Sequence, residues 1–214
     1  TPDGSEKVLI TSNDSRIRVY DLKQKRLARK FRGASYLNRT SQIRASVSED
    51  GKTVDMTLRE GVTFHSGNPF TAKDVVWTIE RLKESPDYRA IFDPVASAEA
   101  VDDYTVEITT SEPYPLLLNL ATYIFPMDSE FYTGETEDGN DKAEIVKAGN
   151  SFASRNVSGT GPFIVTDRRQ GVRVDFKRFE DYWDTESEGN VSEIILTPIA
   201  ENASRVAALL SGGV

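Results

Sequence analysis

Two short runs of alternating polar and apolar residues, separated by the tetrapeptide Ser-Glu-Asp-Gly at 48–51, constrain the fold more than any other feature. The runs extend from Gln42 to Val47 and from Thr53 to Leu58, and their period of two predicts half-buried β-strands. Asp-Gly favours a tight hairpin turn, since glycine adopts a positive φ without steric cost. We therefore predict an antiparallel hairpin across residues 43–58.

The other predicted elements indicate a mixed α/β fold, in which sheets rich in antiparallel strands are flanked by helices. A helix is predicted after Thr71, which can cap it, and is expected to end before Ser85-Pro86. Three short runs near the amino terminus form, with residues 42–47, an expected N-terminal β-meander: 7–11, 16–20 and 27–31. Further along we predict a hairpin at 97–110, a short helix at 115–121, strands at 163–167, 172–178 and 191–198, and a helix at 202–210 ended by Gly212-Gly213.

Composition narrows the classes of function. The 214 residues carry 26 Lys/Arg and 34 Asp/Glu, a net charge of −8, which argues against a general nucleic-acid-binding protein. Cysteine is absent and histidine occurs once, so disulfide frameworks, thiolate zinc sites and histidine pairs are excluded within the chain. The charge is uneven: residues 1–50 hold 11 basic and 6 acidic side chains (net +5), whereas residues 51–214 hold 15 and 28 (net −13).

No motif in the sequence predicts catalysis or a cofactor. Gly159-Thr160-Gly161 lacks the further glycine or the Lys-Ser/Thr of a phosphate-binding loop, and no Gly-x-Ser-x-Gly sequence occurs. The acidic stretch 138–142 resembles the start of a calcium loop, but Lys142 stands where a ligand is needed, and we expect a solvated loop. We expect His65 to be a loop or core residue. The sequence thus predicts a protein that is not an enzyme and has no cofactor or metal.

Several motifs, in order, resemble one known family. Residues 48–83 resemble the signature of the oligopeptide/dipeptide/nickel class (family 5) of extracytoplasmic solute-binding proteins, the receptors of ABC importers. The resemblance continues through three shorter motifs, Ser158 to Phe163, Phe179 to Trp183, and Ala203 to Gly212. It implies a type-II-like periplasmic binding protein fold, a peptide or small solute as ligand, an ABC permease as partner, and a periplasmic or extracytoplasmic location.

The same resemblance implies two candidate ligand-binding residues. In the family, the segment that follows the capped helix contributes an aromatic residue to the cleft between two lobes, and Tyr88 matches that position. Segment 122–124 lies on the same rim, which makes Tyr123 the second candidate. Family members are well over twice the length of this chain, so the resemblance implies a partial first lobe, with little or no ligand binding and a tendency to self-associate through the exposed face.

The residues before Ser48 resemble something else. Residues 12–22 resemble the central strands of a WD-repeat β-propeller blade, with Tyr20 where that repeat usually has tryptophan, and residues 41–48 resemble the opening strand of the next blade. We therefore expect two domains, a propeller-like β-strand segment at 1–47 and a partial first lobe at 48–214, joined as a chimera. The alternative is a divergent solute-binding N-terminus, because residues 19–22 also fit an early strand of that family.

Two other functions stay open at this point. The chain could be a WD-repeat-like protein-interaction module, or an engineered or recombined chimera with no evolved function. The sequence begins at Thr1 without a charged-then-apolar leader, so we expect a mature form, a fragment or an engineered form that lacks its signal peptide.

Overall fold

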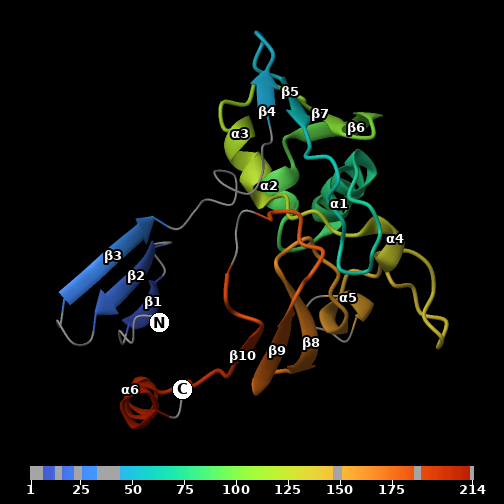
Figure 1. Ribbon diagram of the computed structural model, residues 1–214. Coiled ribbons are helices and arrows are strands. Elements are labelled where there is room, and N and C mark those ends of the chain that lie inside the picture. Colours follow the sequence, from blue (N-terminus) through green and yellow to red (C-terminus); the bar gives the residue numbers. More distant parts are fainter. Residues whose placement is uncertain are drawn as a thin grey trace.

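The computed structural model describes residues 7–12, 16–21, 26–32, 44–146, 151–185 and 189–212 (Figure 1). Its strands form three separate antiparallel sheets, with orders β1-β2-β3, β4-β5-β7-β6 and β10-β9-β8. This arrangement confirms the predicted mixed α/β class with antiparallel sheets. Gln42, Ile43 and Gly213, which we assigned to a strand and to a helix stop, lie outside the described residues.

The first sheet contains the first three predicted strands, coloured blue in Figure 1. They are β1 (Lys7–Ser12), β2 (Arg16–Asp21) and β3 (Arg26–Arg32). β2 lies in the middle, so that Val19 is opposite Leu9 on one side and Arg29 on the other.

The hairpin around residues 48–51 is confirmed, but its first strand belongs to a different sheet from the one we expected. β4 (Arg44–Val47) pairs with β5 (Thr53–Thr57), with Val47 opposite Val54 and Gly51 at φ 69° in the turn. Assigning residues 42–47 to the N-terminal meander was therefore wrong. The tight turn places β4 beside β5, in the four-stranded sheet, and not beside β3.

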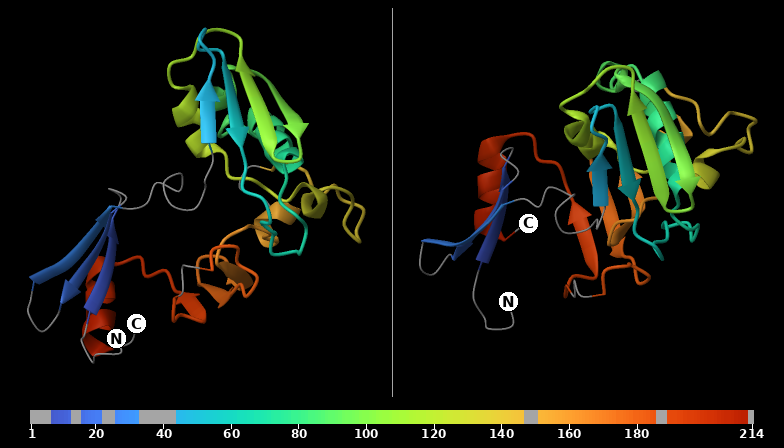
Figure 2. Two further views of the ribbon diagram at one scale, coloured as in Figure 1. Left: turned by 45° about the horizontal axis from the view of Figure 1, so that its top comes forward. Right: turned by 90° about the horizontal axis from the view of Figure 1, so that it is seen from above.

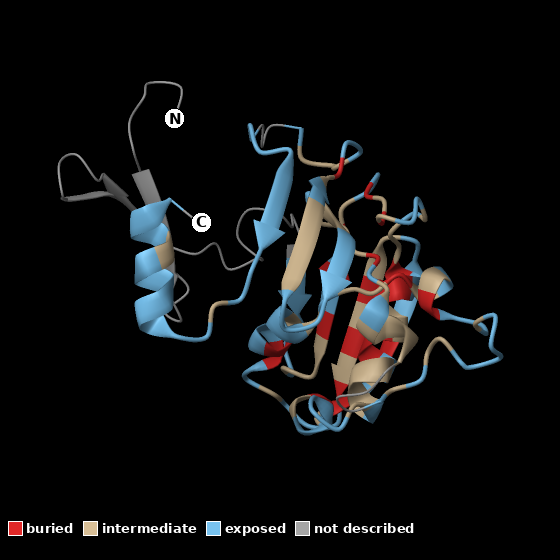
Figure 3. Ribbon diagram, turned by 90° about the horizontal axis from the view of Figure 1, so that it is seen from below, coloured by how far each residue is buried: buried red, intermediate tan, exposed pale blue. Residues whose placement is uncertain are grey.

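The main core lies between this four-stranded sheet and a long helix. β6 (Val95–Asp102) and β7 (Thr105–Thr110) form the predicted second hairpin, and α1 (Ala72–Glu84) begins after Thr71 and ends at Ser85 as predicted. Val54 and Ile108 on the sheet and Ile79 on the helix have no exposed surface. Figure 3 shows the buried residues concentrated where α1 packs on this sheet.

The carboxylate of Asp74 closes the cap of α1 and also joins the start of this helix to a distant segment. The Thr71 N–H donates to Asp74 Oδ2 over 2.8 Å, which closes a capping box. The other oxygen of Asp74 accepts from the N–H of Ser129 (3.0 Å) and from its hydroxyl (2.7 Å). Ser129 opens α4 (Ser129–Tyr132), so one carboxylate fixes the beginning of two helices.

Short helices and a third sheet complete the described chain. Between β5 and α4 lie α2 (Arg89–Phe92), α3 (Leu117–Leu120) and the 3-10 helix η1 (Ala121–Tyr123). They are followed by α5 (Phe152–Arg155), β8 (Phe163–Arg169), β9 (Arg173–Arg178), β10 (Glu193–Leu196) and α6 (Asn202–Ser211). The left view of Figure 2 shows this third sheet apart from the four-stranded one, with α6 after β10. Among the described helices, none combines the length and apolar character that crossing a membrane requires.

Candidate functional site

Tyr88, the first ligand-binding candidate, lies where the chain turns out of α1. It occupies the N-cap of α2, and its carbonyl accepts the N–H of Ile91 over 2.9 Å. Pro86 explains this local path, because the residue before a proline avoids the α-helical region and α1 must end there. The side chain of Tyr88 is 37% exposed, so its ring is available to a ligand.

Tyr123, the second candidate, is the last residue of η1. In this stretch some apolar side chains are buried in the core and others are exposed to solvent. Leu117 and Leu120 are buried and hold the stretch against the core. Tyr123 is 45% exposed, and the neighbouring Leu118 and Phe125 are exposed as well. Among the described residues, no recorded ring contact or hydrogen bond joins Tyr123 to Tyr88. Both tyrosines are thus accessible, and neither lines the cavity described next.

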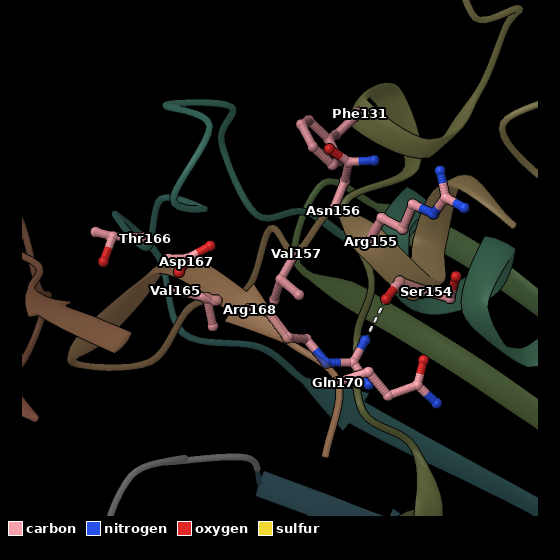
Figure 4. Close-up of a pocket in the computed structure, with 10 residues that line it drawn as sticks. All are labelled: Phe131, Ser154, Arg155, Asn156, Val157, Val165, Thr166, Asp167, Arg168 and Gln170. Carbon is pink, nitrogen blue, oxygen red and sulfur yellow. Dashed lines mark hydrogen bonds between the residues drawn. The ribbon is translucent and has the colours of Figure 1, made fainter. Parts of the chain in front are cut away.

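A cavity of about 600 Å³ lies elsewhere, between α5 and β8 (Figure 4). The Arg168 guanidinium donates a hydrogen bond to the carbonyl of Ser154, while the Arg155 side chain points away from that bond. Asp167 forms an ion pair with Arg169 at 3.2 Å. The lining combines polar groups with a smaller apolar part: Phe131, Ser154, Arg155, Asn156, Val157, Val165, Thr166, Asp167, Arg168 and Gln170.

Sequence reasoning did not identify this cavity. Its walls come from separate segments, and no local sequence motif predicts that these segments pack together. Neither tyrosine candidate lines it. Chemically, the cavity offers hydrogen-bond donors and acceptors beside a short apolar wall, features that small-molecule binding sites share.

A fully buried carboxylate, that of Asp128, joins three segments near this cavity. One of its oxygens accepts from the Asn68 amide (3.0 Å) and from the Phe131 N–H (3.0 Å). The other accepts from the hydroxyls of Ser66 (2.5 Å) and Ser158 (2.7 Å). Burial acts to raise the pKa of Asp128, but the four hydrogen bonds to the charged form outweigh it and leave the pKa below its ordinary value. Sequence reasoning missed Asp128, and the weak signal was its N-cap position before α4.

His65 lies half-buried in the loop that follows β5, as a loop histidine was expected to. Its backbone N–H donates to the carbonyl of Gly159 over 2.8 Å, and its ring bonds to the same glycine-containing segment. The ring also meets Phe179 edge-to-face, with 4.9 Å between the centroids.

The acidic stretch at 138–142 contains a turn in which Gly139 has φ 75° and donates its N–H to the Thr136 carbonyl. Over the described ranges, no three His, Asp or Glu side chains gather in a way that could hold a metal ion.

Comparison with known proteins decides the family. The model of the bacterial extracellular solute-binding proteins, family 5, matches residues 25–214. The chain belongs to this family. A similar curated relative is the glutathione-binding protein GsiB of Escherichia coli O1:K1, which is 28% identical over 170 residues. The aligned part covers 78% of this chain but 31% of the relative, so the chain spans about a third of the length of that protein.

Two solved structures extend the likeness to the fold. NikZ from Campylobacter jejuni, in complex with Ni(L-His), aligns with a TM-score of 0.67 and 25% identity, over 80% of this chain and 32% of its own. DppA from Helicobacter pylori, an ABC transporter-associated periplasmic binding protein in complex with the peptide STSA, aligns with a TM-score of 0.64 and 26% identity. That alignment covers 80% of this chain and 36% of DppA.

These comparisons confirm the resemblance found from residue 48 onward but do not support a WD-repeat or a chimera. The family match begins at residue 25, inside the segment that we assigned to a propeller. The boundary expected after residue 47 therefore does not coincide with the start of the match. The similarity to a propeller rested on short alternating strands and Asp-Gly turns, which antiparallel sheets of unrelated folds share.

Proposed function

We propose that the chain is part of a non-catalytic receptor outside the cytoplasm that binds a peptide or small solute and delivers it to an ABC permease. The observation that carries this proposal is the family match over residues 25–214. It is supported by relatives named for binding glutathione and by a solved neighbour that holds a tetrapeptide. Residues 48–214 would form part of the first lobe.

In this proposal Tyr88 and Tyr123 contact the ligand. A tyrosine offers a flat apolar ring with a hydroxyl at its end, so it can pack against a peptide side chain and hydrogen-bond to a peptide carbonyl. Both rings are already exposed, and their backbones are fixed by the short helices that they adjoin. Binding through them would need little rearrangement of the chain.

The 214-residue chain by itself should bind peptides weakly. A ligand resting on rings that are 37% and 45% exposed keeps part of its hydration while still losing its translational freedom. Titration calorimetry with the tetrapeptide STSA should therefore detect no submicromolar binding, and Tyr88→Ala should abolish whatever heat is measured. Asp138→Ala, on the exposed acidic loop, is the control that should leave the heat unchanged. Submicromolar binding by a monomer, or binding that survives Tyr88→Ala, would contradict the assignment.

The same exposed rings should promote self-association. An apolar surface left open to water tends to find a partner, and Tyr123 continues into the exposed Phe125. In sedimentation velocity experiments, the wild-type chain should show a concentration-dependent rise in average mass, and the double variant Tyr88→Ser/Tyr123→Ser should reduce it. Val101→Ser provides the matched control, because Val101 is 62% exposed on β6, away from both rings in the sequence. A wild-type chain that stays monomeric throughout would exclude this prediction.

A further inference from the structure

The only histidine of the chain bridges two of its sheets. His65 lies in the loop after β5 of the four-stranded sheet, and the segment it contacts, Ser158–Gly161, leads directly into β8 of the third sheet. Both nitrogens of the ring are used. Nε2 lies 2.8 Å from the carbonyl oxygen of Gly161, and Nδ1 lies 3.3 Å from the backbone nitrogen of Gly159.

These two partners allow a single protonation state. A carbonyl oxygen only accepts a hydrogen bond, so Nε2 must carry a proton. A backbone N–H only donates, so Nδ1 must present its lone pair. The ring that satisfies both is the neutral imidazole with its proton on Nε2. In the imidazolium, the added proton on Nδ1 would face the N–H of Gly159, and that hydrogen bond would be lost while the bond to Gly161 remained.

We propose that His65 is a proton-sensitive latch: its ring accepts the Gly159 N–H while it is neutral and loses that bond when it is protonated, whereas the backbone bond from the His65 N–H to the Gly159 carbonyl remains. The ring also lies close against the segment, because a side chain added at Gly159 would come within 3.8 Å of His65 Cε1. The proposal concerns the joint between the sheets and is independent of the ligand-binding role proposed for the tyrosines.

The His65 ring is surrounded by backbone atoms and an aromatic ring, so protonation acts directly on its own two hydrogen bonds. The 158–161 segment presents backbone atoms to the ring, and the segment after β9 presents Phe179, whose neighbours Glu180 and Asp181 are exposed. Asp128, the N-cap of α4, accepts the hydroxyls of Ser66, which follows His65, and of Ser158, which precedes Gly159.

Loss of the ring bond to Gly159 should not affect Ser158, because Ser158 forms two other hydrogen bonds. Its hydroxyl donates to Asp128, and its backbone N–H donates to the hydroxyl of Tyr132 over 3.1 Å. The pKa of Asp128 lies below its ordinary value, so this carboxylate stays ionised at neutral pH and keeps its bond to the Ser158 hydroxyl.

A single histidine makes the test direct. In the full chain labelled with ¹⁵N, long-range spectra of the ring should show the proton on Nε2 at the alkaline end of the titration. As the ring becomes protonated, the exchange protection factor of the Gly159 amide, which corrects for the intrinsic pH dependence of exchange, should fall about tenfold. The Ser158 amide is the internal control, and its protection should persist.

Three results would overturn the proposal: a neutral ring with its proton on Nδ1, Gly159 protection that does not change across the titration, or loss of protection at Gly159 and Ser158 together. His65→Gln gives a second measurement, because its side-chain amide can donate and accept but does not titrate. In that variant the pH dependence of Gly159 protection should disappear, and its persistence would assign the effect to another group. If the variant does not fold, the wild-type titration decides alone.

Discussion

Replacing Phe92 by alanine should lower the free energy of unfolding by about 3–5 kcal/mol, the usual cost of removing a fully buried aromatic ring. Phe92 has no exposed surface and is the one fully buried residue of α2, in the core between α1 and the four-stranded sheet. Alanine would remove the ring's contacts and leave a cavity that the sheet and α1, fixed by their own hydrogen bonds, cannot collapse to fill. Urea denaturation followed by circular dichroism would measure the loss.

Phe125→Ala is the matched control for this prediction, since the same side chain is removed at a position that is 60% exposed. Its effect should remain within about 0.5 kcal/mol. Equal destabilisation by the two variants would mean that Phe92 does not contribute to the core as the structure indicates.

Replacing Asp128 by alanine should cost about 3 kcal/mol or more, because four donors would lose their common acceptor inside the protein. Asp128 is completely buried, and the donors come from the loop after β5, from α4 and from the segment before β8. Asp128→Asn should cost less, since serine hydroxyls can rotate to accept as well as donate. Asp138→Ala, at an exposed position, should leave the stability unchanged, and comparable losses in both alanine variants would refute the prediction.

The contribution of Asp128 should also depend on pH, in a direction fixed by its depressed pKa. Burial opposes ionisation, but the hydrogen bonds from Asn68, Ser66, Ser158 and the backbone hold the folded pKa below the ordinary 3.8. The folded state therefore binds this proton less readily than the unfolded chain does, and the stabilisation is complete above pH 3.8 and decreases as the pH falls through the folded pKa. The stability difference between wild type and Asp128→Asn should shrink in that acidic range; a constant difference would contradict the assigned pKa.

The sequence predicted well those elements whose signals are local. The turn at 48–51, the cap at Thr71 and the stop at Ser85-Pro86 lie where residue chemistry placed them. Each depends on conformational preferences within a few neighbouring residues, and such preferences can be read from one chain without its tertiary structure.

The features that the sequence did not predict depend on contacts between residues that are distant in the chain. The place of β4 in the four-stranded sheet follows from the order of strands. The side-chain bonds that Asp128 accepts from Ser66, Asn68 and Ser158, and the two ring bonds of His65, join residues 30 to 96 positions apart. The motif resemblance indicated the family, because several ordered motifs are more specific than any single one. The short strands before Ser48 carried too little information to separate a propeller from another antiparallel sheet.

The carboxylate of Asp74 makes the folding of two distant helices interdependent. It accepts the N–H of Thr71 at the start of α1 and both donors of Ser129 at the start of α4, 55 positions further along the chain. Neither helix start is complete without the other, so local opening at residues 128–132 removes part of the support for the first turn of α1. The two regions should therefore exchange their amide protons as one cooperative unit, and substitutions at Thr71 and Ser129 should not be additive.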